Sequence, residues 1–472
     1  MQNQDKYKKL TTNTLILGIG SFSSKLLIFF LASFYTHVLT PSEFGTADLI
    51  VLTANLLFPL VSLGVSNAAL RFALDKDWDK KKVFSTCIAL CLIGYLLSFI
   101  LFPLVKLYSN KFAPDIATYI SLIYIFILTS SLRNILSNFT RGLEKVKLYA
   151  IDGVICTATT IALTLLFLYF FHFGVMGYCL AIIIADSLSV LFLFLVGKLY
   201  NHLSLKFKNF EFKKIMAYSI PLIPTMVFWW ITNVSDRYFI TAMIGSSANG
   251  LYAISQKLPT IIVVISGIFI DAWNISAVTA KKEERKDFFK NIFSAYSSLM
   301  LLLGSFVIML SRVFIHIYAS PRFQGAWEYI PFLTLAMLFQ CFSSFFGTIY
   351  VVEKKSINSM WTLLIGAVIN IILNLLLIPY MGPNGAAFAT FMSYLVVFIV
   401  RVIDTKKFLS FKINYLLISI NTAILLAQTS LLLMNFSIYY QLPLVLLLMA
   451  INYKSAKVQI VLILGKFRKK AV

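Results

Sequence analysis

The stretch WWITNVSDRYFITAMIG, residues 229–245, places Asp236 and Arg237 side by side in an otherwise apolar segment. Apolar stretches of similar length recur along the whole 472-residue chain. Each is long enough to cross a hydrocarbon core of about 30 Å as a helix. The chain is 59% hydrophobic and 13% charged, with a mean hydropathy of +0.85. These features predict an all-α polytopic membrane protein that carries two charges at membrane depth.

The hydropathy pattern predicts about 14 transmembrane helices. The N-terminal apolar stretch is taken as the first of them, because it is long and has no small-residue cleavage site. The predicted spans are residues 11–37, 46–69, 83–105, 116–137, 148–172, 177–198, 215–243, 248–274, 289–312, 329–351, 359–379, 384–402, 413–434 and 438–463.

The net charge of +22 is distributed according to membrane topology. If both termini are cytosolic, most Lys and Arg residues fall in cytosolic segments or at the adjoining span ends, as the positive-inside rule requires. The predicted outer loops hold four: Lys106, Lys111, Arg312 and Arg322. The basic composition is thereby explained without nucleic acid as a partner.

Cysteine and histidine residues give no metal or redox pattern. All five cysteines lie in predicted spans without CxxC spacing, and the four histidines are scattered singly. Isolated cysteines in apolar segments are typical packing residues. We therefore expect no metal site and no cofactor, and the absence of a P-loop motif argues against ATP as the energy source.

A weak internal repeat divides the chain. Three short motifs recur in the same order at offsets of 205, 208 and 209 residues: Gly45 with Gly250, Gly174-x-x-Gly177 with Gly382-x-x-Gly385, and Glu144-Lys145 with Glu353-Lys354. Six spans separate the copies, so both halves have the same orientation, which defines a parallel repeat. The prediction is six plus six spans, with two additional spans at the end. Its domains are residues 1–199, a basic cytosolic linker 200–214, a second bundle 215–404, and two additional helices with a basic tail at 405–472.

Charged residues inside spans are the candidate functional residues, because an ionised group at the bilayer centre costs roughly 2.5–3.5 kcal/mol on insertion scales. The predicted substrate-binding cations are Arg237, Lys25, Lys257 and Arg133. The acids predicted to couple an ion or balance charge are Asp236, Asp186, Asp48 and Asp271. Asp152 is charged as well but is predicted to lie near a span end.

Asp236 and Arg237 are predicted to have different partners, since adjacent side chains on a helix point about 100° apart. Two interpretations of Arg237 stay open at this stage. Its planar guanidinium suits a phosphate in an aqueous cavity. Alternatively, it extends outward to the membrane surface from the outer half of its span. Pro221, Pro224 and Pro259 lie in the same two spans and favour bends there.

Five segments together resemble the polysaccharide or O-antigen flippases, the Wzx-type branch of the multidrug/oligosaccharidyl-lipid/polysaccharide exporter superfamily. They are LASFYTHVLTPSEFGTADLI (31–50), LGVSNAALRFAL (63–74), TRGLEKVKLYA (140–150), SDRYFITAMIGSSANGLYAISQKL (235–258) and LIPYMGPNGAAFATFMSYLV (377–396). The resemblance implies a fold of two six-helix bundles around a central cavity, with two C-terminal helices. It implies translocation of an undecaprenyl-diphosphate-linked oligosaccharide from the inner to the outer leaflet of a bacterial inner membrane. It further implies alternating access driven by a H⁺ or Na⁺ gradient, and a polysaccharide polymerase or chain-length protein as a partner.

Three alternatives remain. A multidrug antiporter of the same superfamily would favour cationic cargo, whereas the deep charges here lean towards cations in the protein and hence an anionic cargo. A lipid II flippase would share the same mechanics. A membrane-embedded glycan polymerase or transferase is the alternative from a different class, and the short predicted loops argue against a separate catalytic domain. We therefore expect a transporter and not an enzyme.

Overall fold

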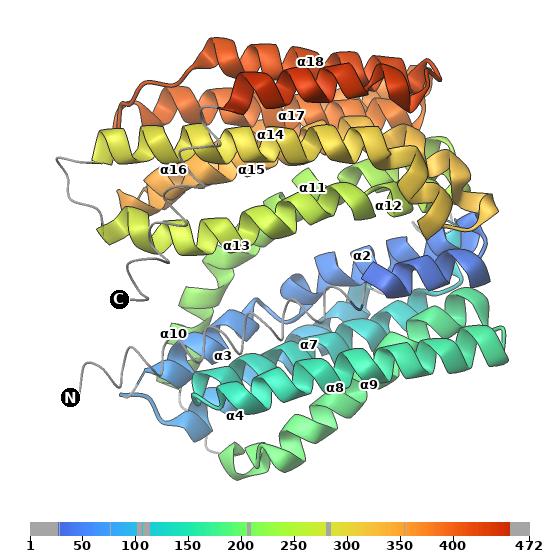
Figure 1. The fold of residues 1–472 in the computed structure, drawn as a ribbon. Coiled ribbons are helices and arrows are strands. Elements are labelled where there is room, and N and C mark those ends of the chain that lie inside the picture. Colours follow the sequence, from blue (N-terminus) through green and yellow to red (C-terminus); the bar gives the residue numbers. More distant parts are fainter. Residues whose placement is uncertain are drawn as a thin grey trace, which may run out of the picture. The chain divides into compact units, whose positions relative to one another are not determined.

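The computed structural model describes residues 27, 29–75, 77–101, 106, 114–204, 209–279, 285–353 and 355–453, and within them it is helical with no strand (Figure 1). Ten helices are long and apolar enough to cross a membrane, and two further bent pairs satisfy the same criteria together. Shorter apolar helices, Phe29–Val38 and Ile438–Tyr453, adjoin residues outside the described set. Twelve of the 14 predicted spans thus have a counterpart of sufficient length in the described residues, the first and the last extend outside them, and the prediction of an all-α polytopic protein is confirmed.

The helices group into two compact units. Unit 1 comprises Met1–Trp230 together with Gly245–Gly250, and unit 2 comprises Ile231–Ile244 together with Leu251–Val472. The chain therefore passes from unit 1 to unit 2, returns for six residues, and leaves again. The two six-helix bundles with their central cavity stay a prediction.

Unit 1 is built around the central helix α7 (Ile120–Gly142), which packs against five neighbours. These are α2 (Pro41–Val61), α3 (Val65–Leu74), α4 (Lys80–Ser98), α8 (Val146–Thr164) and α9 (Gly174–Val196) (Figure 1, blue to green). The short α6 (Pro114–Ala117) precedes α7, and α10 (Asn209–Ser219) packs on α3 and α4.

Small residues permit this packing. Ala68, Ala69 and Ala73 of α3 are buried, and a Cβ atom on Gly142 would lie only 2.5 Å from the Cβ of Ala73. Because lipid is as apolar as leucine, helices in a membrane associate through close van der Waals contact, which small residues allow.

The start of α2 is fixed by its sequence TPSE. Thr40 is the N-cap, its hydroxyl accepts from the backbone N–H of Glu43, and the Glu43 carboxylate accepts from the backbone N–H of Thr40. Pro41 occupies the first helical position, where its missing N–H costs nothing. This capping box sets the register in which Gly45 lies one turn into the helix.

Unit 2 is built around α15 (Ile330–Val352), which packs against α13, α14, α16 and α17. The helix bounds are α11 (Ile223–Met243), α12 (Ser246–Ser255), α13 (Lys257–Thr279), α14 (Arg285–Tyr318), α16 (Ser356–Met381), α17 (Pro383–Thr405) and α18 (Tyr415–Leu433). Residues Ile223–Trp230 of α11 and Ser246–Gly250 of α12 belong to unit 1. The core of unit 2 is aromatic, with Trp273, Phe289, Phe293, Phe345 and Phe346 in mutual contact.

The span with Pro221 and Pro224 and the span with Pro259 are both bent, as predicted. Glu211–Phe228 and Asn233–Met243 differ in direction by 52°, and Ser246–Ser255 and Lys257–Ile270 differ by 42°. Pro221 lies in a 3₁₀ turn between α10 and α11, and Pro259 lies in the first turn of α13. The second bend falls within one turn before Pro259, whose ring excludes the carbonyl of the preceding turn, whereas the first falls at residues 229–232, beyond Pro221 and Pro224.

Candidate functional site

Four of the predicted site residues fall into two buried polar networks, one in each unit. Arg133 and Asp186 belong to the network of unit 1, and Asp236 and Arg237 belong to that of unit 2. Lys25 lies outside the described residues. Asp271 lies in α13, but its side chain is outside the described set.

Asp48 and Lys257 lie on two further helices, α2 and α13. Asp48 is half-buried on α2, and Lys257 is half-buried at the first position of α13. Lys257 therefore begins the helix directly after the 42° bend between Ser246–Ser255 and Lys257–Ile270.

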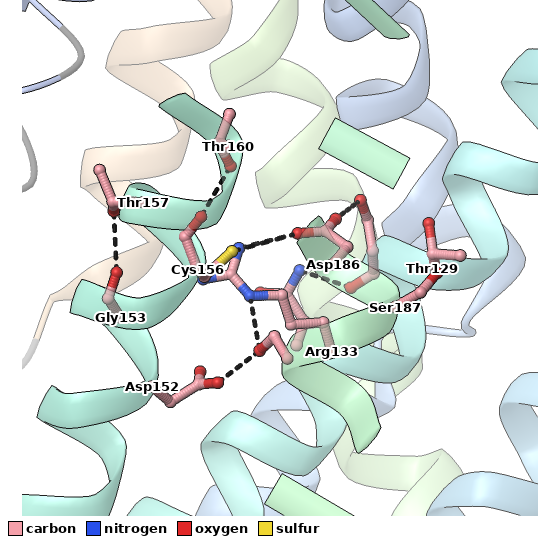
Figure 2. A network of polar contacts seen from close by, with 12 residues as sticks. Thr129, Arg133, Asp152, Gly153, Cys156, Thr157, Thr160, Asp186 and Ser187 are labelled. Atoms are coloured by element: carbon pink, nitrogen blue, oxygen red, sulfur yellow. Dashed lines mark hydrogen bonds and ion pairs between the residues drawn. The ribbon is translucent and has the colours of Figure 1, made fainter. Parts of the chain in front are cut away.

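The network of unit 1 joins α7, α8 and α9 (Figure 2). The Arg133 guanidinium donates from Nη1 to Asp186 Oδ1 at 3.0 Å and from Nε to Ser189 Oγ at 3.2 Å. Ser189 in turn donates to Asp152 Oδ1 at 2.5 Å. One guanidinium is therefore linked to two carboxylates, directly to one and through a hydroxyl to the other.

Asp186 is held as an acceptor on both oxygens. Its Oδ1 accepts from Arg133 and is 3.8 Å from the Cys156 thiol, and its Oδ2 accepts from Ser130 Oγ at 2.5 Å. Asp186 is 4% exposed and Asp152 only 1%, whereas the Arg133 side chain is 31% exposed. Burial of this kind is tolerated because the carboxylates are hydrogen-bonded and share a cation.

Asp152 belongs to this network, although the hydropathy pattern does not predict its burial. Its position in the sequence predicts a span end, yet the packing of α8 on α9 buries it completely. A signal for it exists in the spacing of its partners. Ser130 and Arg133 on α7, like Asp186 and Ser189 on α9, are three residues apart and so share a helix face.

The network of unit 2 starts from the quoted stretch on α11. Tyr252 Oη donates to Asp236 Oδ2 at 2.6 Å, and the backbone N–H of Arg237 donates to Asp236 Oδ1 at 2.9 Å. The Arg237 guanidinium donates from Nη2 to Gln256 Oε1. Asp236 and Arg237 thus have different side-chain partners, as their adjacency predicts.

Arg237 is buried at 8% exposure, and Asp236 at 3%. The alternative in which the Arg237 side chain extends outward is therefore wrong for this structure. The physical reason is the acceptor that Gln256 offers inside the unit, which satisfies a guanidinium donor at a buried position.

Further polar residues of unit 2 continue this network. Asn233 Oδ1 accepts from Tyr394 Oη at 2.7 Å and from Gln340 Nε2 at 3.1 Å. Ser235 donates to Asn370 Oδ1 at 3.1 Å, and Asn370 donates to Thr390 at 3.2 Å. These partners are not predictable from the sequence, because neutral polar residues inside a span do not stand out in its hydropathy pattern.

Arg401 on α17 is a buried cation that is not among the candidate residues predicted from the sequence. It is 5% exposed, and its donors reach Ser343 O at 2.7 Å, Thr362 Oγ1 at 3.0 Å and Ser359 Oγ at 3.2 Å. All three acceptors are neutral oxygens from α15 and α16. Hydropathy placed Arg401 at the edge of a predicted span, where a charge needs no explanation.

In an all-α polytopic membrane protein, charged networks buried in both helical units mark candidate functional sites. The sequence of residues 10–274 matches the family model described as polysaccharide biosynthesis protein. The chain belongs to this family, which agrees with the resemblance of its sequence segments to proteins of polysaccharide export. The match covers both Arg133–Asp186 and Asp236–Arg237, whereas Arg401 lies beyond it.

Individual relatives are distant. An uncharacterized membrane protein of Methanocaldococcus jannaschii is 24% identical, with 82% of this chain and 95% of that protein covered. The fold is similar to that of the lipid II flippase MurJ in an inward closed conformation, with a TM-score of 0.73 and 16% identity over 94% of this chain and 98% of that one. It is also similar to an inward-facing MATE multidrug transporter of the MOP superfamily, with a TM-score of 0.67 and 12% identity over 81% and 95%.

Proposed function

We propose that this protein is a flippase for an undecaprenyl-diphosphate-linked oligosaccharide. The cargo would move from the inner to the outer leaflet of a bacterial inner membrane by alternating access, with no covalent change. The observation that carries this proposal is the buried Arg237 on α11, in a chain of the polysaccharide biosynthesis family. The positive-inside distribution of Lys and Arg supports cytosolic termini.

Arg237 has the chemistry that this cargo requires. A diphosphate cannot enter hydrocarbon unaided, because unsolvated charges and hydroxyl groups cost several kcal/mol each. A guanidinium offers a planar set of donors that matches phosphate oxygens. Nη2 of Arg237 donates to the neutral amide oxygen of Gln256, which a phosphate oxygen can replace as acceptor.

The other proposed groups divide into binding and balancing roles. Lys25, Lys257 and Arg133 are proposed to add positive charge along the path of the diphosphate. Asp236, Asp186, Asp48 and Asp271 are proposed to bind H⁺ or Na⁺ from the driving gradient, or to hold the cations between cargo molecules. A polysaccharide polymerase or chain-length protein is the proposed downstream partner, because the exported repeat unit must be joined to others.

The proposal is tested by the variant Arg237→Ala in a strain that lacks the chromosomal copy. We expect surface polysaccharide to fall at least about tenfold, as for the loss of a charge-assisted contact of about 1.4 kcal/mol or more, while lipid-linked repeat units accumulate on the cytosolic side. Arg322→Ala is the matched control, because Arg322 is an exposed arginine. Normal surface polysaccharide in a well-expressed Arg237→Ala protein would exclude this role.

A lipid-linked cell-wall precursor is the second candidate cargo. It is favoured by the same observation, since a polyprenyl diphosphate would present the same phosphates to Arg237. The two cargoes are distinguished in the same strain. Loss of the protein should stop either polysaccharide export or peptidoglycan synthesis, and labelled precursors extracted from each leaflet report which one accumulates.

A further inference from the structure

Asp152 of α8 is buried in the network of unit 1 with a single hydrogen-bond partner. It is 1% exposed, and its Oδ1 accepts from Ser189 Oγ at 2.5 Å. Among the described residues, its second oxygen, Oδ2, has no hydrogen-bond partner (Figure 2). An ionised carboxylate can accept about four hydrogen bonds, and a buried one that lacks donors is costly. One neutral donor is therefore a poor environment for an ionised Asp152.

The network holds two carboxyl groups but one guanidinium. Arg133 forms a direct ion pair with Asp186 at 3.0 Å and reaches Asp152 only through the hydroxyl of Ser189. With both carboxyl groups ionised, these three charges would sum to −1 at buried positions. An unpaired buried ion costs several kcal/mol, and a carboxyl group avoids this cost when it binds a proton. The charge balance therefore calls for one proton in the network.

The contacts favour Asp152 over Asp186 as the group that holds this proton. Asp186 accepts from a guanidinium on one oxygen and from the hydroxyl of Ser130 on the other, both of which stabilise its ionised form. Asp152 has a neutral partner only.

Few ionisable groups face Asp152. They are Arg133 from α7, Asp186 from α9 and Cys156, one turn further along α8. The π-helix that continues α8 begins at Leu165, about 20 Å further along the axis. Arg133 is therefore the cation for which the two carboxyl groups compete.

The contact between Ser189 and Asp152 suits both protonation states. When Asp152 is ionised, the hydroxyl donates to Oδ1. When Asp152 is protonated, Oδ1 can donate in the opposite direction across the same 2.5 Å, because the Ser189 oxygen can accept from it and from Arg133 Nε together. Oδ2 is then the carbonyl oxygen of a neutral acid, for which a missing donor costs less than for a charged oxygen. Solvent reaches this network at the Arg133 side chain, which is 31% exposed.

We infer that Asp152 is a proton-binding site of unit 1, protonated while Arg133 is paired with Asp186 and able to exchange that proton with water. Only the proton moves, between water and the Asp152 carboxyl group, and no other bond changes. The inference deepens the proposed function and rests on it for its role. It assigns to Asp152, and not to Asp186, the H⁺ that unit 1 takes from the gradient, while Asp186 holds Arg133 in place.

The test is infrared spectroscopy of the purified full-length protein in liposomes, titrated upward from about pH 5, where an ordinary aspartate is already ionised. A protonated carboxyl group has a C=O stretching band that is lost on ionisation. The difference between the native protein and Asp152→Asn isolates this band, because Asn has the shape of the protonated acid without its proton. We expect the band at about pH 5, its loss as the pH rises, and no change in the control Asp75→Asn, which alters a surface pair with Arg71.

Two variants that retain Asp152 should shift its titration in opposite directions. Asp186→Asn leaves Arg133 to Asp152 alone, so the band should be lost at least about one pH unit lower, a tenfold lower proton affinity. Ser189→Ala removes the donor to ionised Asp152, so the band should persist at least about one pH unit higher. A merely structural Asp152 would give neither shift. Both variants report on Asp152 even if Asp152→Asn does not fold.

Three results would overturn the proton site. They are a difference spectrum without the band at any pH tested, a titrating band that is retained in Asp152→Asn and belongs to Asp186, and an unshifted titration in both Asp186→Asn and Ser189→Ala. None of these measurements needs the cargo. Loss of the proposed flippase activity with the expected spectra would therefore refute the function and leave the proton site standing.

Discussion

The ion pair between Arg133 and Asp186 makes the most quantitative prediction about unit 1. Asp186→Ala removes the acceptor of Arg133 Nη1 at 3.0 Å and of Ser130 Oγ at 2.5 Å. Removing one partner of a fully buried pair costs 3–5 kcal/mol. The Arg133 side chain is 31% exposed, and solvent screens part of this loss. We therefore expect the free energy of unfolding to fall by about 2–3 kcal/mol.

The assay is a double-mutant cycle on unfolding free energy, measured by steric trapping in bicelles. Arg133→Met alone leaves the Asp186 and Asp152 carboxylates without their shared cation and should destabilise the protein as well. In the double variant, Asp186→Ala should restore part of the unfolding free energy that Arg133→Met removes. The effect of the double change should therefore be about 1–2 kcal/mol smaller than the sum of the two single effects. Asp75→Asn is the control, because Arg71 and Asp75 form an exposed pair at 3.7 Å, and its effect should stay below about 0.5 kcal/mol. Additive single variants, or an Asp186→Ala effect no larger than the control, would refute the pairing argument.

Two further predictions concern unit 2. Gly347→Ala should lower the stability of unit 2 by about 1–3 kcal/mol, because the new Cβ atom would lie 2.9 Å from Nη1 of Arg401. Gly267→Ala is the control, because a Cβ atom there would meet no other atom within 4 Å, and it should have almost no effect in a thermal melting assay of both variants. Asn421 and Asn452 exchange hydrogen bonds at 3.2 and 3.0 Å. Either Asn→Leu change alone should cost about 1–2 kcal/mol, and the double change should recover most of it. A double variant that is no more stable than the two single variants would contradict the pairing of Asn421 with Asn452.

Hydropathy predicts the spans well, because the bilayer imposes one length on every helix. The ends of the helices are less predictable. The helix α14, for example, extends over Arg285–Tyr318, beyond the predicted span 289–312. Its additional turns continue past the apolar core, where the sequence no longer has to be apolar and so gives no boundary signal.

The candidate site is predictable only in its local part. Separate partners for Asp236 and Arg237 follow from helix geometry, but the partners themselves do not. Tyr252 and Gln256 reach α11 from the next helix, and Arg133 meets Asp186 across 53 residues of chain. These pairings depend on helix rotation and depth, which are set by packing against all neighbours at once.

The buried arginines of the two units have different partners, and this contrast favours different roles. In unit 1, Arg133 is linked to Asp186 and Asp152, so its charge is compensated by protein carboxylates. In unit 2, Arg401 donates to neutral oxygens of Ser343, Thr362 and Ser359, and its guanidinium lies over the ring of Tyr350. A guanidinium already bound to a carboxylate has less to gain from an anion than one bound to neutral oxygens, because the carboxylate must first be displaced or neutralised. Within the proposed function, Arg133 is therefore expected to act more through its effect on the carboxylates than by binding the anion itself.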